Sequence, residues 1–257
     1  MTKLIKEFKI DDLFVKIFPD RAAMGKASAQ EAAEKIKDLL KNKSEIRIVF
    51  AAAPSQNEFL DELVKTEGIE WNRIIAFHMD EYIGLNENGV QLFSKYLKDR
   101  IFDKVDFKEV HLINPKDNPE EEVENYETLL KENPIDIVFM GIGENGHIAF
   151  NDPPVADFND SKFVKIVELD EPCRQQQVND GCFSSFDEVP KRAITLTVPA
   201  LMSGNYLFVV VPGIRKANAV SKTLNGGIIT NCPASILRTH KNAVLYLDKD
   251  SSLELSL

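Results

Sequence analysis

Runs of apolar, β-branched residues recur along the chain with almost no polar interruption. A strand with one exposed face alternates apolar and polar residues, so uninterrupted runs indicate strands buried on both faces. Helices that cover both faces of a mostly parallel sheet produce such burial. The expected strands are IRIVFAAAP (46–54), RIIAFHMDEY (73–82), VHLIN (110–114), IDIVFMGIG (135–143), AITLTV (193–198), YLFVVVPG (206–213) and AVLYLD (243–248).

Helical patterns separate these runs. Residues 21–40 carry an alanine-rich apolar stripe at helical spacing, and residues 55–67 repeat the pattern with Ser55 or Asn57 as the expected N-cap. A third helix is expected in 118–134, opened by its Asn-Pro pair and closed before its last proline. The alternation of strands and helices favours a doubly wound α/β fold, whose ligand crevice lies beyond the carboxyl ends of the strands.

The stretch from residue 151 to residue 190 differs from the rest. It is polar, it is broken by Pro153, Pro154 and Pro172, and it has no clear period. A long irregular insertion in a compact domain is usually functional, so we expect this stretch to form a lid over the crevice. The sequence has no repeat, low-complexity tract or interdomain linker, and we expect residues 1–257 to form a single domain.

The composition argues against several classes of protein. The formal net charge is -10 and no block of Lys and Arg stands out, which disfavours nucleic-acid binding. The N-terminal sequence is too charged for a signal peptide, and no apolar run approaches the ~20 residues of a membrane span. Cys173, Cys182 and Cys232 form no CxxC pair and cannot all pair with one another. We therefore expect a soluble chain in the reducing cytoplasm, without membrane or nucleic-acid partners.

The sharpest motif is MGIGENGHIAFNDPP at 140–154. Its glycines satisfy the G-x-G-x-x-G pattern of dinucleotide sites, but Asn151 and two prolines interrupt the long helix that such a site requires. We expect instead a turn that presents His147 to a small ligand, since imidazole exchanges protons near neutral pH. Either Glu144 or Asp152 can hold the ring in one tautomer. The alternative is an incidental histidine in a capped turn.

Two adjacent acids, Asp80 and Glu81 of FHMDEYIGL, follow an apolar strand. An open α/β sheet binds its ligand at the carboxyl ends of its strands, so one carboxylate is expected in the crevice. Asp80 can act as a base if a dry crevice raises its proton affinity. The alternative is that such acids cap a helix. We expect His78 to pack or to hydrogen-bond, and not to act as a second catalyst.

Several polar residues are candidates for binding an anion. Ser55 and Gln56 of AAAPSQN lie at the expected start of a helix, whose backbone amides can bind a phosphate. The alternative is that this turn only connects a strand to a helix. Lys216 of VPGIRKANA and Arg174 of the 151–190 stretch are candidate counter-charges, or else surface charges. No zinc-type spacing of Cys and His and no G-x-S-x-G turn is present, so we expect neither a metal site nor a serine esterase.

Four ordered blocks resemble the glucosamine-6-phosphate deaminase family, within the wider group of sugar-phosphate isomerases and 6-phosphogluconolactonases. The blocks are FHMDEYIGL, MGIGENGHIAFNDPP, VPKRAITLTVPALM and VPGIRKA. The resemblance implies a three-layer α/β fold and no metal or organic cofactor. It also implies conversion of an aminohexose 6-phosphate to fructose 6-phosphate with release of ammonia.

The resemblance also implies roles for individual residues. Asp80 matches the carboxylate that moves a proton between C2 and C1, and His147 matches the imidazole that assists ring opening. Lys216 matches a cation that holds the substrate phosphate, and Arg174 is placed as a second such cation. The family's Gly- and Thr-rich phosphate turn is replaced by AAAPSQN, so Ser55 and Gln56 must supply its groups.

Three further positions depart from the family pattern. Asn145 stands where many members have an Asp, and an amide orients the neighbouring groups but cannot relay a proton. Asp152 replaces a Glu and is one methylene shorter. The segment PPVADFNDSKF replaces the serine- and arginine-containing segment that some members use for allosteric activation, so we expect no such activation.

The leading hypothesis is an isomerising deaminase that acts on glucosamine 6-phosphate or a close amino-sugar phosphate. The first alternative is a lactonase of the 6-phosphogluconolactonase type, which would also use His147 but would activate water. A second alternative is a catalytically weak sensor that binds a phosphorylated sugar. The expected partner in each case is a small phosphorylated sugar, and the sequence leaves open whether the protein is a homo-oligomer.

Overall fold

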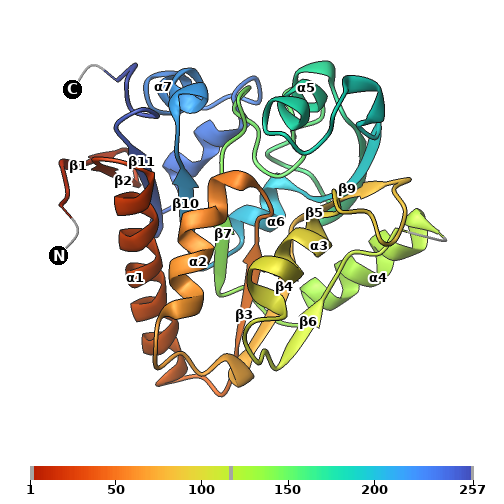
Figure 1. Ribbon diagram of the computed structural model, residues 1–257, viewed down its shortest axis with the longest axis horizontal. Helices are drawn as coiled ribbons and strands as arrows, with labels where there is room; N and C mark the ends of the chain where they lie inside the picture. Colours follow the sequence, from red (N-terminus) through yellow and green to blue (C-terminus); the bar gives the residue numbers. More distant parts are fainter. Residues whose placement is uncertain (1–2, 116–117, 256–257) are drawn as a thin grey trace.

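An eight-stranded sheet forms the centre of the computed structural model, which describes residues 3–115 and 118–255. The strand order is β1-β2-β11-β10-β7-β3-β4-β6 (Figure 1). Only β1 and β2 pair antiparallel, whereas every other neighbouring pair is parallel. The strands are β1 (Lys6–Ile10), β2 (Leu13–Phe18), β3 (Ile46–Phe50), β4 (Ile74–His78), β6 (Glu109–His111), β7 (Ile137–Met140), β10 (Tyr206–Val211) and β11 (Ala243–Asp248).

Helices cover both faces of this sheet, which confirms the predicted fold class. In β3, Ile48 and Phe50 pack into one apolar core while Val49 packs into the other, because successive side chains of a strand point to opposite faces. Burial on both sides explains the uninterrupted apolar runs. One face is covered by α1 (Arg21–Leu40), α2 (Asn57–Lys65) and α3 (Phe93–Leu97); the other is covered by α4 (Pro119–Lys131), α6 (Val198–Met202) and α7 (Ala217–Asn225).

The direction of winding reverses between β3 and β7. From β3 the chain continues outward to β4 and β6, whereas from β7 it continues to β10 and β11 on the other side. The loops that follow β3 and β7 therefore separate and leave a crevice at the carboxyl ends of these strands, where open α/β sheets bind ligands. Figure 1 shows α5 and α7 at this end of the molecule, above the strands.

The helix starts confirm two expectations and correct one. The Asn118 side chain accepts a hydrogen bond from the backbone N–H of Glu121 and caps α4, which begins at Pro119 as predicted. Helix α1 has the predicted bounds. The cap predicted for α2 is wrong, because a 3-10 turn (η1, Pro54–Gln56) precedes this helix and no side chain caps it.

A second sheet lies apart from the first and contains three antiparallel strands. Its order is β5 (Asp80–Ile83), β9 (Arg192–Leu196) and β8 (Val164–Glu168). The expectations that 73–82 is one strand and that 193–198 belongs to the parallel sheet are therefore wrong. The chain leaves the first sheet at Met79, whose carbonyl accepts a hydrogen bond from Leu196, and then pairs with β9.

The 151–190 segment is more regular than its sequence indicates. It contains β8, helix α5 (Glu171–Asn179) and a 3-10 turn η4 (Phe186–Glu188). The Asp170 side chain caps α5 by accepting a hydrogen bond from the backbone N–H of Cys173, and Pro172 lies in the first turn.

None of the described helices is long and apolar enough to cross a membrane. The remaining short turns are η2 (Trp71–Arg73), η3 (Lys98–Phe102, a π-helix), η5 (Ile214–Lys216) and η6 (Pro233–Thr239).

Candidate functional site

A cavity lies at the carboxyl ends of β3, β4 and β7, next to the turn that follows β10. Four of the candidate residues line it together, namely Ser55, Asp80, His147 and Lys216. Residues far apart in the sequence thus line one cavity, at the point between β3 and β7 where the strand order reverses. The other lining residues are Ala51–Ala53, Met79, Phe93, Gly141–Gly143, Ala149, Phe150, Gln176, Gln177 and Asp180.

The two adjacent acids have different environments. The Glu81 carboxylate accepts hydrogen bonds from the backbone N–H groups of Tyr82, Phe93 and Ser94 at 2.8–3.1 Å, so it caps the start of α3. Asp80 instead lines the cavity and is 6% exposed. Burial, together with the charges of Glu81 and Asp152, raises the pKa of Asp80 well above its usual value. Asp80 therefore binds a proton more tightly than an exposed carboxyl group does, and its role as a general base stays a prediction.

His147 forms a close pair with Asp152. Its Nδ1 lies 2.8 Å from Asp152 Oδ1, and Asp152 is 1% exposed. The Asn145 amide donates to the same carboxylate oxygen at 2.9 Å, while its carbonyl oxygen accepts from the backbone N–H of His147 at 3.0 Å. Burial acts to raise the pKa of Asp152, but the His147 ring and the Asn145 amide outweigh it and hold that pKa below its usual value. Asp152 thus stays ionised beside the ring.

The glycine-rich turn is shaped around the imidazole. A Cβ atom on Gly143 would lie 2.2 Å from the His147 ring, so only glycine leaves room for it. Gly146 has a φ of +90°, which disfavours other residues. Residues 141–163, all of which the structure describes, contain no helix. The turn therefore lacks the helix that a dinucleotide site requires.

Strand β9 links Asp80 to the turn that carries His147. Asp80 pairs with Thr195 in the second sheet, and Thr195 Oγ1 accepts a hydrogen bond from the backbone N–H of Phe150 at 3.1 Å. The Asn151 side chain donates to the Leu196 carbonyl at 2.8 Å. Asp80 and the turn that carries His147 are therefore fixed relative to each other by a common strand.

Lys216 and Ser55 form the other end of the cavity. Lys216 is 7% exposed, and no hydrogen bond or ion pair of its ammonium group occurs with the residues that the structure describes. Burial lowers the pKa of Lys216, although the negative charges of Asp180 and Glu144 act to raise it. Ser55 Oγ accepts a hydrogen bond from Gln56 Nε2 at 3.0 Å, which leaves the hydroxyl proton free for a ligand. Gln56 itself does not line the cavity and also donates to the Val210 carbonyl.

The chain is similar to known proteins. A family model described as glucosamine-6-phosphate isomerases/6-phosphogluconolactonase matches residues 19–246. The chain belongs to this family. Among curated members, the glucosamine-6-phosphate deaminase of Pseudoalteromonas translucida (strain TAC 125) is 30% identical over 248 residues, which cover 93% of this chain and 88% of the relative. That of Bacillus cereus (strain B4264) is 32% identical over 217 residues, with coverages of 84% and 80%.

Solved structures of the family agree with this assignment. A monomeric glucosamine-6-phosphate deaminase superposes with a TM-score of 0.85 at 29% identity, covering 93% of this chain and 98% of that one. The 6-phosphogluconolactonase of Thermotoga maritima superposes with a TM-score of 0.76 at 21% identity, covering 92% and 100%. The second likeness concerns the fold alone.

Arg174, like Gln56, Asn145 and Asp152, is a candidate residue that does not line the cavity. Its guanidinium donates to the backbone carbonyls of Phe186 and Val189 and stacks on the Phe186 ring, with 4.0 Å between its central carbon and the ring centroid. These contacts hold the end of the 151–190 segment against α5. Arg174 therefore stabilises the 151–190 segment. Of the two candidate cations, Lys216 is the one that lines the cavity.

The sequence analysis missed the contribution of α5 to the site. Gln176, Gln177 and Asp180 line the cavity from this helix and its C-terminal end. Gln176 Oε1 also accepts a hydrogen bond from the backbone N–H of Glu144 at 2.7 Å, so Glu144 contacts α5 and not the His147 ring. The Asp170-Glu171-Pro172 sequence is a helix-start signal that could have located α5.

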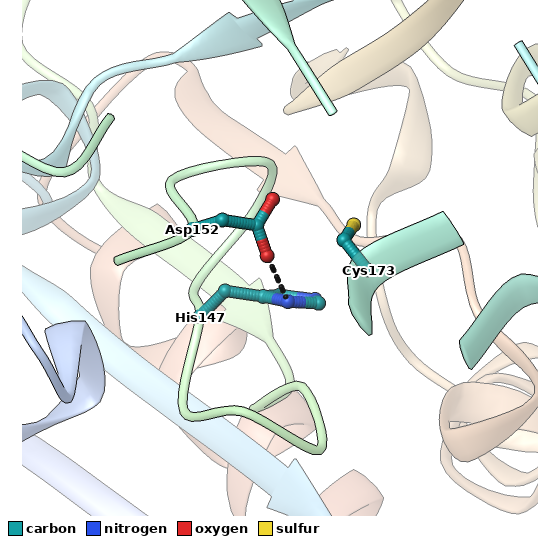
Figure 2. A group of neighbouring side chains, drawn as sticks. All are labelled: His147, Asp152 and Cys173. Carbon is teal, nitrogen blue, oxygen red and sulfur yellow. Dashed lines mark ion pairs between the residues drawn. The ribbon is translucent and has the colours of Figure 1, made fainter. Parts of the chain in front are cut away.

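Three buried side chains in this region have metal-ligating atoms. The ligand atoms of His147, Asp152 and Cys173 all lie within 4.8 Å of one another. Figure 2 shows Cys173 on α5 with its thiol facing the His147–Asp152 pair. No sequence pattern indicates this group, because its members lie on a turn and on a helix that only the fold brings together.

Proposed function

We propose that this protein is an isomerising deaminase that converts glucosamine 6-phosphate, or a close amino-sugar phosphate, to fructose 6-phosphate and ammonia. One observation carries the proposal: a buried Asp80 with a raised pKa shares a cavity with Lys216 and with His147, whose ring pairs with Asp152. The relatives named as glucosamine-6-phosphate deaminases support the same reaction.

The proposed reaction begins with ring opening. His147 takes the proton of the C1 hydroxyl and returns a proton to the ring oxygen, which leaves an open-chain aldehyde. Asp152 stabilises the ring when it is protonated, since its carboxylate lies 2.8 Å from Nδ1. Asn145 holds that carboxylate in place through its amide.

Asp80 then removes the C2 proton while one proton of the substrate ammonium group passes to the C1 oxygen, which gives an enolamine, and Asp80 returns its proton to C1. The resulting C2 imine adds water and releases ammonia, so the balance is one water consumed for each ammonia formed. Lys216, Ser55 and amides at the start of α2 bind the phosphate, because cations and helix starts stabilise a dianion. Gln56 positions the Ser55 hydroxyl.

The test is a direct assay of purified protein without added metal. Glucosamine 6-phosphate, galactosamine 6-phosphate and 6-phosphogluconolactone are supplied separately, while ammonia, fructose 6-phosphate and acid release are followed. We expect ammonia and fructose 6-phosphate from the first substrate and no lactone hydrolysis above background. Lactone hydrolysis alone would support the lactonase, and binding without turnover of any substrate would support a sensor.

A further inference from the structure

The His147–Asp152 pair has polar atoms that the protein leaves unsatisfied. Nδ1 of His147 and Oδ1 of Asp152 are close, but they lack the alignment of a hydrogen bond. Nδ1 and Asp152 Oδ2 are both buried and neither makes a well-aligned hydrogen bond with the described residues, although the Cys173 thiol lies near enough to the Asp152 carboxylate to help lower its pKa. Buried polar atoms are nearly always satisfied, so two unsatisfied atoms at one point indicate a missing ligand.

Cys173 adds a third donor from another element. It lies in the first turn of α5, is 1% exposed, and has its sulfur within 4.8 Å of the ligand atoms of both other residues. Figure 2 shows the three side chains converging, with His147 and Asp152 on the turn after β7 and Cys173 on the helix opposite. One imidazole, one carboxylate and one thiol thus face a common point.

This donor set is specific in its chemistry. Imidazole and thiolate select zinc and similar ions over magnesium or calcium, which prefer oxygen ligands. A carboxylate and a thiolate together neutralise a divalent cation, so the filled site carries no net buried charge. Zinc bond lengths of about 2.0–2.3 Å require donors roughly 3.3–3.6 Å apart, so the 2.8 Å pair would open by about 0.5 Å.

We propose that His147, Asp152 and Cys173 bind Zn²⁺ or a chemically similar divalent ion, and that this ion inhibits the enzyme. Binding displaces the Cys173 proton to solvent, leaves the neutral His147 ring protonated on Nε2, and involves no redox change. Because His147 also lines the cavity, a water molecule or a substrate oxygen supplies the fourth ligand from that side. The ion removes His147 from proton transfer, so it acts as an inhibitor and not as a cofactor.

The first experiment measures binding without reference to activity. Chelator-treated protein is titrated with Co²⁺ as a spectroscopic substitute for Zn²⁺, and the thiolate-to-cobalt charge-transfer band is recorded. We expect the band in the wild type and in Cys182→Ser, the matched control at the half-buried thiol. We expect no band in Cys173→Ser. Absence of the band in the wild type, or its persistence in Cys173→Ser, would overturn the proposal.

A second variant covers the case in which Cys173→Ser does not fold. Asp152→Asn keeps the thiol and the shape of the site but loses the anionic ligand, so its cobalt affinity should fall by at least about tenfold. An unchanged affinity would exclude the site. Circular dichroism and the thermal midpoint of each variant show whether the fold is retained.

The inhibition itself rests on the proposed function and is tested separately. Half-inhibition of ammonia release by Zn²⁺ should require at least about tenfold more metal in Cys173→Ser than in Cys182→Ser. If cobalt binds at Cys173 but Zn²⁺ does not inhibit, the regulatory part of the proposal is wrong. If the protein has no deaminase activity at all, the proposed function fails while the cobalt band still decides the site.

Discussion

At the scale of single residues, Asp80 and Glu81 show how neighbouring carboxylates acquire different tasks. Burial raises the pKa of both residues, but Glu81 accepts hydrogen bonds from three backbone donors and serves as a helix cap, whereas Asp80 faces a cavity. The sequence analysis left both interpretations open for this pair. The helix-cap interpretation is correct for Glu81, whereas the interpretation of Asp80 as a base stays a prediction.

We predict that Asp80→Asn lowers kcat by about 10²–10⁴-fold while substrate affinity changes little, since an amide keeps the shape but accepts no proton. The measurement combines steady-state ammonia release with calorimetric binding of glucosamine 6-phosphate. Glu81→Ala is the contrasting variant and should lose about 1–3 kcal/mol of unfolding free energy, because three backbone donors lose their acceptor. Normal turnover by folded Asp80→Asn would refute the assignment.

The raised pKa of Asp80 predicts a pH dependence of stability. Its folded-state pKa exceeds the unfolded value, so the native state binds the proton more tightly. Stability therefore falls as pH rises from the ordinary carboxyl range towards the raised pKa. Asp80→Asn should remove this decline and unfold at a higher temperature than the wild type near neutral pH. A scan of thermal midpoints against pH for both proteins tests this, and parallel curves would contradict it.

The two candidate phosphate cations should behave differently. Lys216→Ala should weaken binding of the phosphorylated sugar by about 1.5–3 kcal/mol and leave the unphosphorylated sugar unaffected, because a charge-assisted contact is lost. Arg174→Ala should reduce the thermal midpoint without changing that selectivity, since Arg174 contacts backbone carbonyls. Binding titrations with both sugars distinguish the cases. A selective loss in Arg174→Ala would restore its role at the phosphate.

At the scale of elements, the turn after β7 depends on its glycines for the position of one ring. Gly143→Ala places a methyl group within 2.2 Å of the His147 imidazole, so the ring must move. A displacement of about 1 Å at a catalytic group can reduce the rate about 10²-fold, and we predict a loss of this order in kcat. Gly227→Ala, where the nearest atom would be 3.6 Å away, is the matched control and should retain full activity.

At the scale of the whole molecule, the 151–190 segment completes the cavity and contacts the turn after β10. Arg215 donates to the Asn179 carbonyl, and its guanidinium lies 3.7 Å from Asp180. We propose that this contact holds the segment closed over the substrate. Since the pair is partly exposed, its contribution is small.

Arg215→Ala is therefore predicted to raise KM by a few-fold with a smaller change in kcat. The kinetic parameters for glucosamine 6-phosphate measure this effect directly. Lys249→Ala, which removes an exposed cation elsewhere on the surface, controls for the change in net charge. An equal effect of both variants would show that long-range charge, and not closure, is responsible.

The sequence by itself determined the parallel core and its main helices. Uninterrupted apolar runs indicate strands buried on both faces, and the Asn-Pro pair indicates the start of α4. Both signals can be recognised in the sequence because they depend only on neighbouring residues. The hairpin of β1 and β2 could also have been predicted from the sequence. Its residues alternate around Asp11, which takes a positive φ of 50° in the turn between the two strands.

Only the tertiary structure decided what each polar residue does. Separation of Asp80 from Glu81, the choice of Asp152 over Glu144 beside His147, and the approach of Cys173 all depend on where β9 and α5 pack. The contacts made through β9 and α5 join positions tens of residues apart, and no local pattern encodes them. Burial then sets the chemistry, because removing a carboxyl group from water changes its proton affinity more than any neighbour in sequence does.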